Sequence, residues 1–341
     1  MNPAAQPVEI IGGGLAGLAL GRALRRAAVP VTLFEAGEYP RQRVCGEFLT
    51  GLDDDTVERL DLEPMLAGAV RHDRVAWFDR DRLIAQQKLP QPARAISRWL
   101  LDSRLAEAFA REGGHLVTGT RRDAAPRPGR VIAAGRRRAA QPWIGLKMHV
   151  RGMPLAAGLE MHLGQEAYVG LCQLADGETN ICGLFRRQGL ARRERRDLLA
   201  AYLEASGLGA LAGRVAAAQG CAGSEAAVAG MGFGKHASAT DELALGDARC
   251  TLPPLLGNGM AAAFQMAIAA SAPLVNWSRR RCSWTDACEQ VQRQLQPSFR
   301  LRVELGTLVH RFLLSPVEHG WLAGLARAGC VPFGLLYRLL H

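Results

Sequence analysis

The chain has 341 residues, of which 48% are hydrophobic and 22% charged. This balance excludes a disordered or fibrous protein and predicts two domains, or one large domain with an insertion. No run of about 18 apolar residues lacks a charge or a break, so we expect no membrane-spanning helix. The first residues have neither the basic nor the apolar region of a signal peptide.

Charge and cysteine content narrow the functional classes. The net charge is +10 and comes almost entirely from arginine, which reflects either a GC-rich genome or an anionic cofactor, substrate or membrane surface. The 8 cysteines are scattered and none has the spacing of a zinc site, so we expect no metal and a reducing, cytoplasmic environment. No basic helix or aromatic–basic pattern indicates a nucleic-acid partner.

The N-terminal segment predicts a strand, a helix and a second strand. Val8–Ile11 is a short apolar run typical of a buried parallel strand. The residues from Leu15 to Ala28 are rich in good helix formers. After a Val-Pro break, Val31–Glu35 has the composition of a second strand. Together these segments form a βαβ unit.

A glycine pattern joins the first strand to the helix, in the order Gly12-x-Gly14-x-x-Gly17. Gly12 allows a tight turn, Gly14 lets a diphosphate approach the backbone, and Gly17 lets the helix pack closely on the strand. The helix N-terminus supplies N–H groups for phosphates. Glu35, at about the expected 20-residue distance, can accept the ribose hydroxyls. The unit predicts a site for FAD or NAD, which also includes Leu15, Ala16 and Ala36.

The middle of the chain changes from an α/β pattern to a β pattern. We expect a helix over 98–113 and strands over 115–118 and 130–134. Apolar and polar residues then alternate, as in antiparallel strands, over 147–150, 166–171 and 180–184. A charged helix over 188–207 follows, and 217–234 fits no element. This order predicts an antiparallel sheet between two α/β stretches.

A second glycine-rich segment decides between the two cofactors. A strand is expected over 243–247, and a strongly apolar helix over 260–276. An aspartate at the end of that strand can bind a polyol hydroxyl, and the glycine turn and helix N-terminus can bind the electron-rich edge of a flavin. NAD requires no such second site, so FAD is favoured. The residues assigned here are Gly246, Asp247, Pro254, Gly257, Asn258, Gly259 and Met260.

The C-terminal part is predicted to be helical from Ser283 onward, with breaks near Pro297, Pro316 and Pro332. The apolar stretch 321–341 either packs on the core or rests on a membrane or carrier surface.

These motifs together resemble the flavoproteins of the p-hydroxybenzoate-hydroxylase fold. The resemblance covers residues 8–280 and includes Arg98-x-x-Leu101-Asp102 between the two glycine segments. Members include class A flavin monooxygenases, flavin-dependent halogenases and geranylgeranyl reductases. The resemblance implies an α/β fold with a Rossmann-like FAD-binding domain (1–68, 96–141 and 238–290). An antiparallel-sheet substrate domain (69–95 and 142–237) interrupts it, and C-terminal helices (291–341) follow.

The resemblance also assigns residues around the flavin. Arg41–Glu47 is similar to the Cys-Gly-Glu segment of the geranylgeranyl reductases, which implies Cys45 near the isoalloxazine and Arg43 near FAD. Arg98 matches the family arginine that contacts FAD, with a surface cation as the alternative. Cys45 also fits a small buried hydrophobe.

Glu47, Lys147 and His149 are the remaining catalytic candidates. Glu47 is expected to titrate in the working range, because burial would raise its pKa, or else to serve as a structural acceptor. Lys147 and His149 lie on one face of a predicted strand. They would bind an acidic or phenolic substrate, or face solvent.

The predicted function is that of an FAD-dependent oxidoreductase. The first candidate is monooxygenation of a hydrophobic or aromatic small molecule, a secondary metabolite or lipid-like compound, through a flavin C4a-hydroperoxide. The stretch 132–136 lacks the Asp-Gly pair that serves FAD and NAD(P)H in class A hydroxylases, which argues against reduction by directly docked NAD(P)H. The electron donor is NAD(P)H or another reductant. The alternatives are a reductase or dehydrogenase acting on carbon–carbon double bonds, a halogenase, and an escort protein without turnover.

Overall fold

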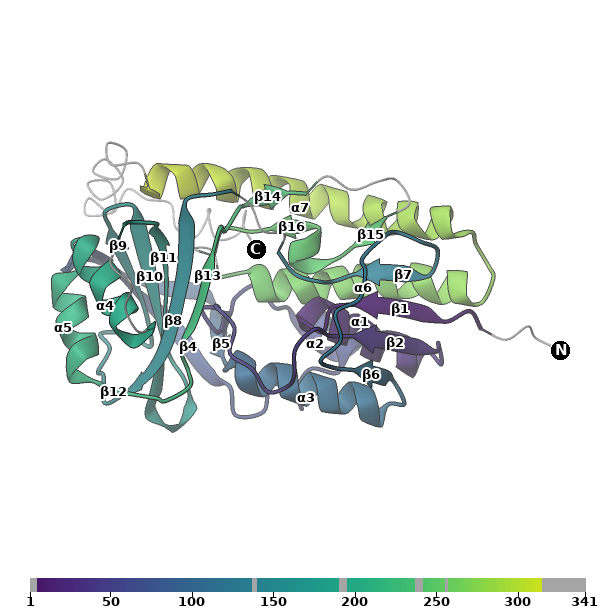
Figure 1. Ribbon diagram of the computed structural model, residues 1–341, viewed down its shortest axis with the longest axis horizontal. Coiled ribbons are helices and arrows are strands. Elements are labelled where there is room, and N and C mark those ends of the chain that lie inside the picture. Colours follow the sequence, from purple (N-terminus) through teal and green to yellow (C-terminus); the bar gives the residue numbers. More distant parts are fainter. Residues whose placement is uncertain (1–4, 137–139, 190–194, 237–241, 255–256, 315–341) are drawn as a thin grey trace.

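The structure, a computed structural model, describes residues 5–136, 140–189, 195–236, 242–254 and 257–314 (Figure 1). One part of the molecule is built on a sheet of five parallel strands. In sheet order these are β15 (Leu243–Ala244), β7 (Arg130–Ile132), β1 (Val8–Ile11), β2 (Val31–Phe34) and β6 (His115–Val117). The predicted βαβ unit is confirmed as β1, α1 (Leu15–Arg26) and β2.

Helices pack tightly around this parallel sheet. They are α1, α2 (Asp54–Leu60), α3 (Arg98–Arg111) and α6 (Gly259–Ser278). Helix α1 packs against both α3 and α6, so most of its residues are buried. Even Arg22 of α1 is buried, and it forms ion pairs with Glu112 at 2.9 Å and Asp61 at 3.3 Å.

Helix α6 is long and apolar enough to cross a membrane, and it is the one such helix in the described part of the chain. It corresponds to the apolar helix that the sequence predicts. More than half of its most apolar stretch is buried inside the protein, where α6 packs against α1 and α7 (Trp284–Leu314). This burial is typical of a core helix.

The second sheet has nine strands and forms the other part of the molecule (Figure 1). Its order is β12-β8-β11-β10-β9-β4-β5-β3, and β13 also pairs with β8. The strands are β3 (Phe48–Leu49), β4 (Val70–Asp79), β5 (Arg82–Ala95), β8 (Trp143–Arg151), β9 (Leu159–Gly164), β10 (Ala167–Gln173), β11 (Glu178–Arg186), β12 (Gln219–Gly220) and β13 (Ala226–Ala229). Helices α4 (Arg195–Ala205) and α5 (Gly209–Ala217) carry apolar residues that share a core with this sheet.

The prediction of a purely antiparallel sheet was wrong at one position. Strands β4 and β9 pair in parallel, whereas the other pairs in this sheet are antiparallel. The β4–β5 hairpin and the β8–β11 strands are separate chain segments whose edges meet at β4 and β9. No local turn therefore fixes the direction of that pair, and the alternation of residues cannot reveal it.

Two further predictions differ from the structure between residues 217 and 251. Residues 217–234 fit no element from the sequence, but they contribute the short strands β12, β13 and β14 (Gly234–Lys235), the last paired with β16 (Cys250–Thr251). The strand predicted over 243–247 ends at Ala244, and Gly246–Ala248 forms a 3₁₀ turn. Gly246 has a φ of +60°, which ends the extended conformation.

The predicted helix break near Pro297 was also wrong, because α7 runs from Trp284 to Leu314. Figure 1 shows α7 lying along both parts of the molecule. A proline inside a helix costs about 3 kcal/mol, and the packing of α7 on α6 and on the second part offsets this cost. The predicted breaks near Pro316 and Pro332 and the stretch 321–341 lie outside the described residues.

Removing the Phe109 side chain should destabilise the α1–α3 contact. Phe109 is fully buried, and a Cβ atom on Gly21 of α1 would lie within 2.9 Å of its ring. We expect Phe109→Ala to lower the free energy of unfolding by about 3–5 kcal/mol in urea denaturation. Leu100→Ala, at a 40% exposed position of the same helix, is the control and should change it by about 0.5 kcal/mol. Equal effects of the two substitutions would contradict this packing.

Candidate functional site

A single cavity of about 810 Å³ receives both glycine-rich segments. The early segment contributes the N-terminal end of α1, and the late segment contributes the N-terminal end of α6. The predicted cofactor residues that line it are Gly14, Leu15, Ala16, Arg43, Arg98, Gly246, Asp247, Pro254, Gly257, Gly259 and Met260. Two regions about 240 residues apart in the chain therefore form one site.

The early glycine turn leaves room at the N-terminus of α1. A Cβ atom on Gly14 would meet no atom within 4 Å, so the backbone there is open to the cavity. Gly12 and Gly17 do not line the cavity. Gly12 has a φ of +112°, and a Cβ on Gly17 would collide with the Gly12 carbonyl oxygen. Gly12 and Gly17 thus shape the turn, and Gly14 provides space for an anionic group.

The end of the site near Glu35 is covered by neighbouring side chains. The Glu35 carboxylate accepts hydrogen bonds from the backbone N–H of Gly13 (2.8 Å) and Gly37 (2.9 Å), and it pairs with Arg41 at 2.8 Å. The Tyr39 hydroxyl donates to the Gly13 carbonyl at 2.5 Å. Neither Glu35 nor Ala36 lines the cavity. The Glu35 side chain is thus buried against its own neighbours, only 6% exposed.

The late segment places a carboxylate beside a helix N-terminus. The Asp247 side chain is 42% exposed toward the cavity and pairs with Arg136 at 3.4 Å. Enclosure within the cavity walls raises the pKa of Asp247 above its ordinary value, although the charge of Arg136 opposes the shift. Helix α6 begins at Gly259, directly after the buried Asn258. A hydroxyl and an electron-rich ring edge could bind here side by side.

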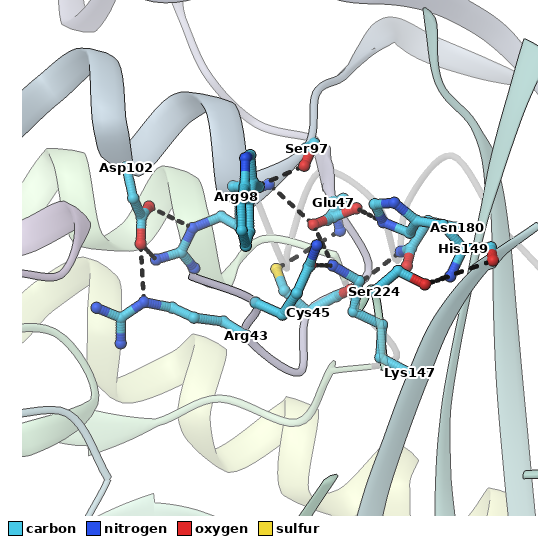
Figure 2. A network of polar contacts seen from close by, with 12 residues as sticks. Arg43, Cys45, Glu47, Ser97, Arg98, Asp102, Lys147, His149, Asn180 and Ser224 are labelled. Carbon is cyan, nitrogen blue, oxygen red and sulfur yellow. Dashed lines mark hydrogen bonds and ion pairs between the residues drawn. The ribbon is translucent and has the colours of Figure 1, made fainter. Parts of the chain in front are cut away.

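Two arginines of the cavity are held by one buried carboxylate (Figure 2). Asp102 accepts from Arg98 Nε at 2.7 Å and from Arg43 Nε at 2.8 Å, and its side chain is fully buried. Arg98 is therefore part of the site and not a surface cation. Asp102 thus fixes the guanidinium groups of both Arg98 and Arg43.

A second buried carboxylate, Glu47, connects three segments (Figure 2). One oxygen accepts from the backbone N–H of Arg98 at 2.8 Å and from Lys147 Nζ at 2.6 Å. The other lies 2.6 Å from His149 Nε2. The side chains of Glu47, Lys147 and His149 are all buried. Glu47 also has a φ of +60°, a conformation that a non-glycine residue keeps only with such support.

These contacts correct the predictions for Glu47, Lys147 and His149. Burial alone would raise the pKa of Glu47, but the hydrogen bond from His149 and the charge of Lys147 lower it below its ordinary value. Lys147 and His149 share one face of β8 as predicted, but they face Glu47 and not solvent. None of the three lines the cavity. The sequence could not show that Glu47 would meet two side chains about 100 residues further along the chain.

Cys45 lies at the cavity wall, next to this buried carboxylate. Its carbonyl oxygen accepts from Asn180 Nδ2 at 3.0 Å, and its Sγ accepts from the Glu47 N–H at 3.5 Å. Asn180 was not predicted as a site residue. It lies on β11 directly opposite His149, and only the strand pairing, not the sequence, reveals this position.

The rest of the cavity lining was largely missed by sequence reasoning. It comes from strands of the nine-stranded sheet, from residues 40–46 and 133–136 and from the segment after β13, and it includes the charged side chains of Arg41, Arg136 and Glu225. Its side chains include Phe48, Met161, Tyr168, Cys182, Leu184 and Met231. Alternating apolar residues indicate strands but not which face of them a cavity uses. Among the described residues, no group of three or more histidine, cysteine or acidic side chains could hold a metal ion.

Comparisons with known proteins agree with this geometry. Residues 10–64 match the family model of an NAD(P)-binding Rossmann-like domain. The menaquinone reductase of Mycolicibacterium smegmatis is 30% identical over 118 residues, which is 33% of this chain and 29% of that protein. The chain thus matches less than a third of the length of this curated relative.

Two solved structures resemble the whole fold. HpxO of Klebsiella pneumoniae, solved with FAD and uric acid, has a TM-score of 0.78 at 16% identity and covers 98% of this chain and 97% of its own. PqsL of Pseudomonas aeruginosa, a probable FAD-dependent monooxygenase, has a TM-score of 0.74 at 16% identity and covers 94% of this chain and 99% of its own.

The chain therefore shares its whole fold, a Rossmann-like part and a second, mixed sheet, with HpxO and PqsL. The resemblance that the sequence motifs indicate, to flavoproteins of the p-hydroxybenzoate-hydroxylase type, is confirmed at the level of the fold.

Neutralising Glu47 should leave the buried Lys147 ammonium without its counter-charge and take the acceptor away from His149. We expect Glu47→Gln to lower the free energy of unfolding by about 3–5 kcal/mol at neutral pH. The pKa of Glu47 is lowered in the folded state, so its stabilisation is present above the unfolded pKa of about 4.3 and is lost as pH falls through the folded pKa. The difference between wild type and variant should therefore shrink on acidification.

Urea denaturation across a pH series measures this effect. The double variant Glu47→Gln with Lys147→Met should recover part of the lost stability, because it also removes the ammonium group that Glu47→Gln leaves without a counter-charge. A difference that is constant down to acidic pH would show that the Glu47 charge does not stabilise the fold.

Proposed function

We propose that the chain is an FAD-dependent oxidoreductase, and that its first candidate activity is monooxygenation of a hydrophobic or aromatic small molecule. The observation that carries this proposal is the single cavity, which is lined by two helix N-termini and by apolar side chains of the nine-stranded sheet. A dinucleotide needs the first feature, and an apolar substrate needs the second.

The residues present fit FAD along the cavity. The open backbone at Gly14 would hold the diphosphate, with Arg43 nearby. Asp247 would bind the ribityl chain, and Gly257 to Met260 would lie at the flavin ring. When bound, FAD supplies the two-electron redox chemistry of the reaction. The chain's own contribution is to position the ring and to set its electrostatic surroundings.

The apolar part of the cavity wall would bind the substrate and exclude water. Met161, Tyr168 and Met231 line the cavity and belong to one apolar cluster, and the Phe48 ring packs between this cluster and Gly257. Such a wall suits a flat or hydrophobic molecule and protects reactive oxygen chemistry from solvent. HpxO with uric acid and PqsL with 2-aminobenzoylacetate bind ring-containing ligands in this fold, which supports an aromatic substrate class.

A second candidate function is the reduction of a carbon–carbon double bond in a lipid-like substrate. The partial match to the menaquinone reductase favours it, as does the Cys45-Gly46-Glu47 segment, whose cysteine lines the cavity. Both candidates use the same FAD site and differ in whether oxygen takes part.

Loss of the Asp247 carboxylate should weaken FAD binding. A charge-assisted hydrogen bond contributes about 1.5–3 kcal/mol, so Asp247→Ala should raise the dissociation constant by roughly 10- to 150-fold. Fluorescence titration of the FAD-free protein measures it, with Glu225→Gln, another cavity carboxylate, as control. Normal FAD affinity in Asp247→Ala would refute the placement of the ribityl chain.

Isotope and anaerobic experiments test the reaction type. The purified protein should be yellow and, supplied with NAD(P)H and an aromatic acceptor under ¹⁸O₂, should incorporate one labelled oxygen atom into the product. The reductase is favoured instead if the dithionite-reduced protein reduces a carbon–carbon double bond of a quinone or polyprenyl substrate in the absence of oxygen. In that case no labelled oxygen should enter the product under air. A colourless protein without FAD affinity would overturn both.

A further inference from the structure

Gly170 stands in the middle of a strand that lines the cavity. It is the fourth of the seven residues of β10, and it borders the cavity. A glycine inside a strand weakens the strand, because it packs no side chain and loses more backbone entropy than other residues. Such a glycine therefore calls for a local reason. The inference drawn from it rests on the proposed function, since it concerns the substrate of the same cavity.

The backbone at Gly170 does not require glycine. The glycines with a positive φ are found elsewhere in the described part of the chain, and Gly170 lies in regular strand conformation. Its cross-strand partners are Cys182 on β11 and Met161 on β9, and both registers run without a shift through Ala167–Cys172. A turn or a bulge is thus excluded at this position. A β-branched residue would suit such a strand better.

Two other strand glycines line the cavity, and in both cases neighbours fill the place of the missing side chain. A Cβ atom on Gly145 of β8 would lie 2.7 Å from Met231 Sδ. A Cβ atom on Gly183 of β11 would collide with the Phe185 ring. Glycine is therefore needed at these two positions for packing within the protein itself.

The place of the missing side chain at Gly170 is not filled in this way. A Cβ atom there would have Met161 Sδ as its nearest neighbour, at 3.3 Å, and the Cys182 carbonyl oxygen next, at 3.9 Å. The first is the end of a flexible side chain, and the second is in ordinary contact distance. The protein thus leaves the backbone of β10 bare on the cavity side. The remaining reason for a strand glycine is the close approach of a ligand.

The residues around Gly170 carry no charge. Cys182 and Met161 flank it on the two neighbouring strands, and Tyr168, two residues earlier on β10, shares its face. All three line the cavity. Burial raises the pKa of Cys182 to about 12, so its thiol stays neutral at physiological pH.

The charged groups of the neighbourhood lie elsewhere or are already paired. Lys147 faces Cys182 across the next strand pair, but it is buried and pairs with Glu47 at 2.6 Å. The charged residues that line the cavity come from segments outside β8–β11. They are Arg41, Arg43, Arg98, Arg136, Glu225 and Asp247.

We propose that Gly170 is the floor of a substrate subsite, in which an uncharged flat ring lies against the bare backbone of β10 between Cys182 and the Met161 thioether. Strands in a sheet are about 4.8 Å apart, so the two flanking strands stand roughly 10 Å from each other, which leaves room for one ring. The sulfur of a methionine makes favourable contacts with aromatic rings. An anionic ring would lose its hydration there without gaining a partner.

Gly170→Val tests the subsite with a residue that strands favour. The FAD-loaded protein is titrated by equilibrium dialysis with naphthol, which is uncharged at neutral pH, and with naphthoate, an anion on the same ring. The wild type should bind naphthol roughly tenfold more tightly than naphthoate. In Gly170→Val the dissociation constant of naphthol should rise roughly tenfold or more, because the isopropyl group takes the place of the ring. The affinity for FAD should not change.

Three further variants separate this steric effect from a change in the fold. Gly170→Ala adds a single carbon and should weaken naphthol binding in the same direction but less. Combining Gly170→Val with Met161→Ala should restore part of the affinity, because Met161 Sδ is the nearest atom to the new side chain. Gly213→Val is the matched control. Gly213 is exposed on α5, outside the cavity lining, and a Cβ atom there meets no atom within 4 Å, so its naphthol binding should equal that of the wild type.

The outcomes distinguish this proposal from the proposed function. Wild-type naphthol affinity in both Gly170→Val and Gly170→Ala, with FAD bound, overturns the subsite and leaves the oxidoreductase intact. Equal losses in Gly213→Val and Gly170→Val also overturn it, as does a wild type that binds naphthoate as tightly as naphthol or binds neither. A protein without FAD affinity removes the proposed function, and the subsite with it. Circular dichroism and FAD content show that each variant is folded and loaded.

Discussion

The buried carboxylate of Glu47 is the contact on which the arrangement of this molecule depends. Burying a carboxylate away from water costs free energy unless hydrogen-bond donors surround it. Here the hydrogen-bond partners of Glu47 come from the start of α3 and from β8 of the second sheet. Satisfying Glu47 therefore requires both parts of the molecule to meet at one point. The same requirement fixes the adjoining Cys45 and Gly46 at the cavity wall.

The cavity follows from this junction. The parallel sheet brings the N-terminus of α1 to it, and α6 contributes a second N-terminus from a distant part of the chain. The nine-stranded sheet closes the other side with apolar residues. The helix N-termini and the arginines held by Asp102 thus line the cavity together with apolar side chains of the nine-stranded sheet. This combination suits a cofactor that is anionic at its diphosphate and reactive at its ring.

Sequence patterns predicted those elements whose formation depends on neighbouring residues in the chain. Periodicity and the Gly12–Gly17 turn located the βαβ unit, and the apolar run located α6. The parallel β4–β9 pair, the continuity of α7 through Pro297 and the lowered pKa of Glu47 could not be predicted. Each depends on a partner far away in the chain: a strand edge, a packed helix, or the buried side chains of Lys147 and His149. The cover that Arg41 places over Glu35 belongs to the same group.

The most direct test of the account is a crystal structure of the protein with FAD. The account predicts the diphosphate at the N-terminus of α1 beside Gly14, the ribityl chain at Asp247, and the flavin ring between Cys45 and the start of α6. FAD bound elsewhere, or bound with its ring away from α6, would contradict the claim that the two glycine segments form one cofactor site.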